Sequence, residues 1–117
     1  MDERVAVEPT AWLPLPDVAE RLDLSISKVR QMVRERSLLA VRREGVLQVP
    51  ADLVANPTAR KHLPGVLTVL RDAGYNEEES LGWLFSPDES LSGGCPARAL
   101  AGPDATEVRR RAQALGF

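Results

Sequence analysis

Apolar residues in the first third of the chain recur at the three- and four-residue spacing of amphipathic helices. The first stripe is Leu15, Val18, Ala19 and Leu22, and Pro16 is well placed in the first turn of that helix. After a break at Asp23-Leu24, the Ser25 side chain can accept a hydrogen bond from the first turn of a second helix. The second stripe is Ile26, Val29, Met32 and Val33. The pattern predicts two helices joined by a tight turn.

Two short β-prone runs follow the second helix, at 38–41 and 46–49. Glu44-Gly45 lies between them, which is typical of a hairpin turn, and Pro50 ends the second run. We expect one more helical turn at 52–55 and then a break at Asn56-Pro57.

The rest of the chain is predicted to be helical. Pro64 begins a helix that Gly74 closes, and Asn76 with Glu79 resembles a capping box at the start of the next one. Gly116 stops the last helix. The expected helices of this part lie at 64–73, 76–85, 96–100 and 104–115.

These elements predict a mainly α fold: a winged helix-turn-helix with a small β-hairpin wing, followed by a helical C-terminal domain. We place an N-terminal tail at 1–13, where Pro9 and Pro14 disrupt any helix. The winged helix-turn-helix domain is expected at 14–56 and the helical C-terminal domain at 62–117.

Composition limits the class of protein further. The chain has 117 residues, and aromatic residues make up 4%, so the core must consist mostly of Leu, Val and Ala. No apolar run approaches the roughly 20 residues that a bilayer span needs, and no secretory signal is visible. The single Cys95 cannot form an intrachain disulfide. We therefore expect a soluble protein of the cytoplasm, with no membrane partner.

Charge gives two opposite indications. The chain has 15 Lys+Arg and 17 Asp+Glu, a formal net charge of -2 and a pI of about 5.4, which argues against a nucleic-acid binder. Segment 25–43, however, holds one acid, Glu35, and six bases: Lys28, Arg30, Arg34, Arg36, Arg42 and Arg43. Segment 76–89 holds no base and five acids: Glu77, Glu78, Glu79, Asp88 and Glu89. Because salt screens charges over about 8–10 Å, the local excess governs attraction to phosphates.

The basic segment predicts an interface with duplex DNA. In a helix-turn-helix the second helix enters the major groove and its N-terminal residues read base edges. Those residues here are Ser25, Ser27, Lys28, Arg30 and Gln31. Arg34 and Arg36 lie further along and are expected to meet phosphates, while Arg42 and Arg43 are placed in the wing to reach the backbone or the adjacent minor groove. The competing interpretation is a basic face that is merely solvated.

Two segments resemble known DNA-binding proteins. Residues 15–29 (LPDVAERLDLSISKV) resemble the opening of winged helix-turn-helix domains of the MerR and excisionase type, and residues 38–43 (LLAVRR) resemble their wing. Residues 62–70, Gly74-Tyr75, 82–91 and 107–114 are similar to an actinobacterial family of small DNA-binding proteins. That family implies a winged helix-turn-helix with a helical C-terminal extension, and a role in transcriptional or nucleoid control.

The mycobacterial member of that family is a substrate of a Ser/Thr protein kinase, which implies a kinase as a partner. The only threonine of the tail is Thr10, with acidic Glu8 nearby. Thr10 is thus the candidate phosphoacceptor, and an ordinary tail residue is the alternative.

A second resemblance concerns the C-terminal half. Trp83-Leu84, Pro87, Leu91, Gly93-Gly94, Pro96 and Ala99-Leu100 resemble the toxin-binding domain of some antitoxins. This implies, as an alternative function, a protein-interaction adaptor that binds a partner through its C-terminal domain. The other interpretation is that Trp83, Leu84 and Phe85 pack the C-terminal helices, as aromatic clusters at helical spacing usually do.

Catalytic chemistry finds no support in the sequence. His62 has no Cys or paired carboxylate at a useful spacing, and Cys95 has no base partner. Acids in the first turn of a helix are explained by the helix dipole. We expect no catalytic residue, no metal and no cofactor.

Overall fold

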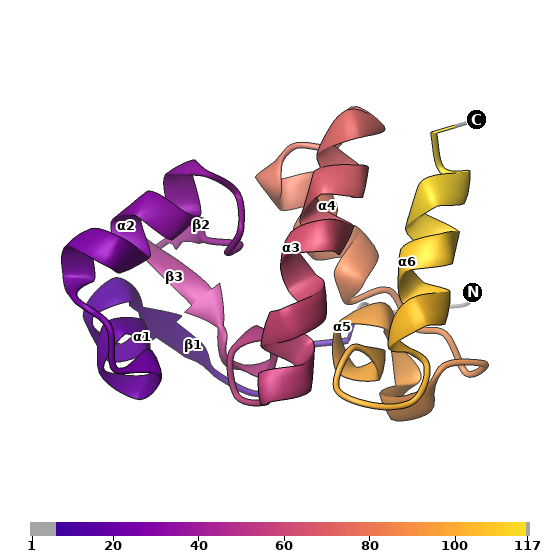
Figure 1. The fold of residues 1–117 in the computed structure, drawn as a ribbon, viewed down its shortest axis with the longest axis horizontal. Coiled ribbons are helices and arrows are strands. Elements are labelled where there is room, and N and C mark those ends of the chain that lie inside the picture. Colours follow the sequence, from indigo (N-terminus) through magenta and orange to yellow (C-terminus); the bar gives the residue numbers. More distant parts are fainter. Residues whose placement is uncertain (1–6, 117) are drawn as a thin grey trace.

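The computed structural model describes residues 7–116. The helix-turn-helix and a small sheet form one end of the molecule, and the later helices form the other (Figure 1). The strands are β1 (Trp12–Pro14), β2 (Val41–Arg43) and β3 (Val46–Pro50). The helices are α1 (Leu15–Leu22), α2 (Ile26–Arg34), α3 (Pro57–Asp72), α4 (Glu77–Leu84), α5 (Pro96–Ala99) and α6 (Ala105–Ala114). Two 3₁₀ turns are η1 (Ala51–Leu53) and η2 (Ser92–Gly94).

The sheet is antiparallel, with the strand order β1-β3-β2. In β2 and β3, Arg42 lies opposite Leu47, and the connecting turn has positive φ at both Glu44 (55°) and Gly45 (80°). Two positive φ angles define a type I′ turn, whose twist matches that of the flanking strands. The predicted hairpin wing is confirmed, but its first strand lies at 41–43 and not at 38–41. Leu38, Leu39 and Ala40 are core residues that precede the strand.

Strand β1 corrects the predicted tail. Trp12 and Leu13, which the sequence places in the tail at 1–13, pair with Pro50 and Val49 of β3. Prolines disrupt helices, but they are tolerated on an edge strand, and β1 is such a strand. Residues 1–6 of the expected tail lie outside the described residues.

The turn between α1 and α2 has the expected local chemistry. Asp23 adopts the left-handed conformation (φ 58°), and the Leu24 N–H donates to the Ala19 carbonyl at 2.9 Å, which ends α1. The Ser25 hydroxyl oxygen accepts from the Lys28 N–H at 3.0 Å, which begins α2. The predicted N-cap is confirmed.

Helix α3 differs from the prediction at its beginning. The expected break is confirmed, because Asn56 is extended (φ -126°, ψ 132°) between the 3₁₀ turn η1 and α3. The expected helical turn at 52–55 is found as η1, at 51–53. The expected start at Pro64 is wrong, because α3 runs through Pro57–Asp72. The Asn56 carboxamide oxygen accepts from the Thr58 N–H at 2.8 Å, and Pro57 occupies the first helical position, where a missing N–H costs nothing.

Pro64 lies inside α3, although proline has no N–H to donate to the helix. The loss of that backbone hydrogen bond is offset by the packing of the buried face of α3.

A single hydrophobic core joins the two ends of the chain. It extends from Leu15 in α1 to Ala112 in α6 without interruption. Helix α3 lies between the sheet and α6 (Figure 1), and its buried side chains include Leu63, Val66 and Leu70. The described part of the C-terminal segment 62–117, which ends at Gly116, therefore packs on the winged part.

The junction of α3 and α4 follows the sequence. Gly74 ends α3 with φ 96°, and Asn76 and Glu79 form a capping box with hydrogen bonds of 2.8 and 2.9 Å.

Within residues 7–116, every helix is too short or too polar to span a membrane.

Arg111 of α6 connects two carboxylates in the C-terminal half. Its Nη1 lies 2.7 Å from Asp88 Oδ2, and its Nε lies 2.8 Å from Glu107 Oε2. Hydrogen bonds from Ser90, and then the charge of Arg111, lower the pKa of Asp88. Hydrogen bonds from Arg111 and Arg110 lower the pKa of Glu107.

This arrangement predicts sensitivity to acid. A carboxyl whose pKa is lower in the folded state stabilises the fold fully above its unfolded pKa, and that contribution is lost as the pH falls through the folded pKa. The chain should therefore lose stability as the pH falls below about 4. In D88N/E107Q the decline should be shallower, as measured by urea midpoints across a pH series. The exposed neighbour Glu89 offers the control, and E89Q should keep the wild-type profile; parallel profiles for D88N/E107Q would contradict the prediction.

Candidate nucleic-acid interface

Helix α2 has one apolar face and one polar face. Val29 is fully buried, and Ile26, Met32 and Val33 pack partly buried against the core. The opposite face is exposed to solvent and holds Ser27, Lys28, Arg30, Gln31 and Arg34. Ser25, at the start of the helix, is exposed as well. All six residues assigned to the recognition helix are thus accessible to a ligand.

The wing lies beside this face. Arg30 and Arg42 line one shallow hollow together with Leu15 and Leu47. Arg30 and Arg34 line an adjoining hollow over the same two leucines. Arg30 and Arg34 of α2 and Arg42 of β2 therefore line adjoining hollows on one side of the molecule.

Arg42 also supports the hairpin turn. Its Nη1 donates to the Gly45 carbonyl oxygen at 3.1 Å. Val46, directly after the turn, keeps 48% of its surface exposed, which is unusual for a large apolar side chain in this fold. The turn thus presents a basic and an apolar group next to each other.

Arg43 lies on the other face of the wing. Neighbouring residues of a strand point to opposite faces of the sheet, so Arg42 and Arg43 cannot both face α2. The Arg43 guanidinium lies 4.4 Å from the ring centroid of Trp12 in β1, a cation–π geometry. The structure therefore places Arg43 on the opposite face of the wing from Arg42, which lies beside Arg30.

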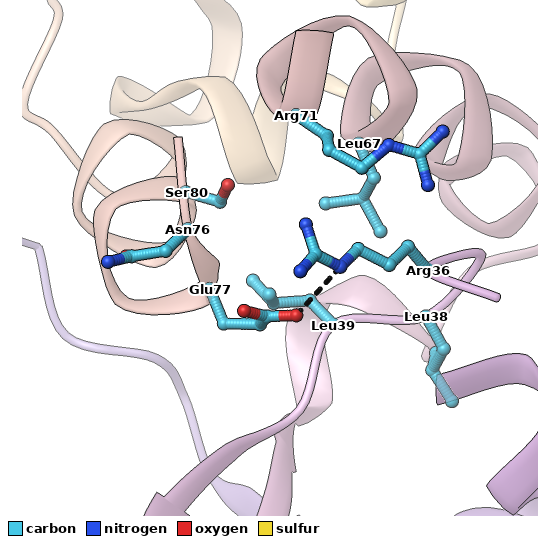
Figure 2. A pocket seen from close by; sticks show the side chains of 8 residues that line it. All are labelled: Arg36, Leu38, Leu39, Leu67, Arg71, Asn76, Glu77 and Ser80. Atoms are coloured by element: carbon cyan, nitrogen blue, oxygen red, sulfur yellow. Dashed lines mark ion pairs between the residues drawn. The ribbon is translucent and has the colours of Figure 1, made fainter. Parts of the chain in front are cut away.

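Arg36 also points away from the exposed face of α2, toward α4. It adopts the left-handed conformation (φ 61°) after α2, and its Nε lies 2.9 Å from Glu77 Oε2. Figure 2 shows the pair between Leu67 and Leu39, and all four residues line a small pocket. Instead of facing the duplex, as the sequence predicted for it, Arg36 binds the winged part to the C-terminal part.

The acidic segment has structural partners. Glu77 pairs with Arg36, Glu79 completes the capping box, and Asp88 pairs with Arg111. Leu84 and Phe85 lie in the core, with relative exposures of 0% and 2%. These contacts support the interpretation that this part of the chain packs the C-terminal helices.

Thr10 is held close to the body of the protein. Its hydroxyl donates to Asp52 Oδ1 at 2.7 Å, and its N–H donates to Asp52 Oδ2 at 3.0 Å. Arg98 of α5 lies 3.6 Å from the same carboxylate and donates to the Glu8 carbonyl at 2.7 Å. The described end of the predicted tail is thus fixed to η1 and α5.

Comparisons with known proteins agree with this geometry. A family profile described as "DNA-binding protein Rv2175c, wHTH domain" matches residues 2–54, and one described as "Rv2175c C-terminal domain of unknown function" matches residues 61–116. The protein named DNA-binding protein Rv2175c, from Mycobacterium tuberculosis, is 43% identical over 122 residues, which cover 94% of this chain and 82% of the relative. This chain belongs to the Rv2175c family.

The fold agrees as well. The NMR structure of Rv2175c superposes with a TM-score of 0.79 at 39% identity, and the match covers 99% of this chain and 87% of that one. The predicted winged helix-turn-helix with a helical C-terminal part is thereby confirmed. In this member of the Rv2175c family, the basic face defined by Arg30, Arg34 and Arg42 lies entirely within the winged part.

Sequence reasoning missed the partners of two arginines. The alternation of side chains along β2 would have separated Arg42 from Arg43, because the hairpin itself was recognised. The Arg36–Glu77 pair could not be predicted from local sequence, since the two residues are far apart in the chain. They meet only when the segment after α2 reaches the start of α4 in the folded protein.

Proposed function

We propose that this chain binds duplex DNA by placing α2 in the major groove, with Arg42 of the wing on the flanking backbone. The observation that carries the proposal is the convergence of Arg30, Arg34 and Arg42 on one exposed side of the winged fold. A helix presents base-reading side chains to the major groove, and arginines neutralise phosphates. The family profile and the M. tuberculosis relative both have the words "DNA-binding protein" in their descriptions.

We further propose that DNA binding by this chain serves transcriptional or nucleoid control in the cytoplasm. The chain would act as a binding protein without catalysis. Its first helices resemble those of the MerR and excisionase type. Recognition of Thr10 by a Ser/Thr kinase stays a prediction. Because the Thr10 hydroxyl is bonded to Asp52, a phosphate there would place two negative groups together and loosen that contact.

The wing supplies a matched pair of variants. R42A and R43A remove the same charge from adjacent residues of β2, but only Arg42 faces α2. We expect R42A to lower duplex affinity by about tenfold and to reduce the slope of log K against log salt by about 0.9, because one phosphate contact is lost. R43A should change both quantities less. Fluorescence anisotropy with a labelled duplex at several salt concentrations measures them, and equal effects of the two variants would contradict this placement of the wing.

A further inference from the structure

Gln31 and Glu35 form a hydrogen-bonded pair one turn apart on α2. Gln31 Nε2 donates to Glu35 Oε2 at 2.9 Å, and both side chains are exposed. An ionised carboxylate only accepts hydrogen bonds, so the end of the amide that faces Glu35 must be the NH₂ group. Glu35 thereby determines which end of the Gln31 amide is left free.

Gln31 lies near the middle of the exposed face. At 100° per residue it is about 160° around the helix axis from Val29, which is fully buried. Ser27 lies one turn before it on the same face, and Arg30 and Arg34 flank it on the side of the wing. Among the polar residues of α2, Gln31 and Ser27 therefore point most directly away from the core.

The free groups of this amide match one base edge. With one N–H given to Glu35, Gln31 keeps Oε1 as an acceptor and a second N–H as a donor. Adenine presents a donor at N6 and an acceptor at N7 in the major groove, which pair with these two groups. Guanine presents acceptors at both O6 and N7. One of these two atoms would therefore face the acceptor Oε1 of Gln31 with no hydrogen between them.

We propose that Gln31 is a specificity-determining residue that selects adenine in the major groove, and that Glu35 is its positioning residue. This inference rests on the proposed function, since it requires α2 to enter the groove. A bidentate contact of this kind corresponds to a preference for the matching base of about tenfold.

Selection of bound fragments from a randomised duplex library tests the proposal. Wild-type protein should enrich adenine at one position, and Q31A should lose that preference while the other positions of the site stay unchanged. E35A frees the amide to present its NH₂ group, so guanine should become tolerated at the same position. Q113A, a change of an exposed glutamine on α6, serves as the control and should retain the wild-type preference.

The outcomes separate this inference from the proposed function. A Q31A site identical to the wild-type site, or an E35A site with unchanged rejection of guanine, would overturn the roles assigned to Gln31 and Glu35 while leaving duplex binding intact. A wild-type protein that retains no duplex above background would overturn the proposed function, and this inference with it.

Discussion

Replacement of both Arg30 and Arg34 by alanine is expected to reduce duplex affinity by about 100-fold, because two charge-assisted hydrogen bonds of about 1.5 kcal/mol or more each are lost. Both side chains are exposed beside the wing, over Leu15 and Leu47, and neither belongs to the core. The salt dependence should flatten as well, by about 1.8 in the slope of log K against log salt if both arginines neutralise phosphates. Anisotropy titrations at four or more salt concentrations give both numbers.

The control for this variant removes the same number of positive charges from a different part of the surface. R71A/R110A removes two exposed arginines from α3 and α6, far from α2 in the sequence. If bulk attraction governed binding, the two double variants would weaken it equally. We expect R71A/R110A to lower the affinity only slightly. Equal losses of affinity in the two double variants would show that the protein binds DNA without docking α2.

Replacement of Leu63 by alanine is expected to destabilise the whole chain by about 3 kcal/mol. Leu63 of α3 is 1% exposed and lies at the interface between the winged part and the C-terminal helices, together with Leu38 and Leu53. A loss of this size is a large share of the stability of a small domain. Because one core runs from α1 to α6, both parts should unfold together and at a lower urea concentration.

The two tryptophans allow each part to be observed separately. Trp12 lies in β1 and Trp83 in α4, so W83F reports on the sheet and W12F on the C-terminal helices. In each background L63A should shift the urea midpoint by the same amount, while L115A, at a 37% exposed leucine after α6, should change it little. Separate transitions for the two tryptophans would show two independent folding units.

Local signals were sufficient for the two helices and the hairpin turn of the winged part. The Ser25 cap, the Glu44-Gly45 turn and the apolar stripe of α2 depend on residues a few positions apart, and the structure confirms each of them. The capping box of Asn76 and Glu79 was predicted for the same reason.

Features that depend on distant contacts were not accessible from the sequence. Strand β1 exists because Leu13 pairs with Val49, and the prolines around it hid this pairing. Helix α3 continues through Pro64 because its buried face is held by packing on both sides, which outweighs the preference of proline for helix starts. Within the candidate site, the exposure of α2 was predictable from its apolar stripe, whereas the direction of Arg36 was not.

We propose that the exposed face of α2 and the wing together form the surface that binds duplex DNA. The most direct test is an NMR titration of isotopically labelled protein with a short duplex, in which the backbone amide shifts are followed. We expect the largest shift changes at residues 25–34 and 42–46, and small changes on the outer face of α6. Changes concentrated on α4, α5 and α6, with α2 unaffected, would contradict it.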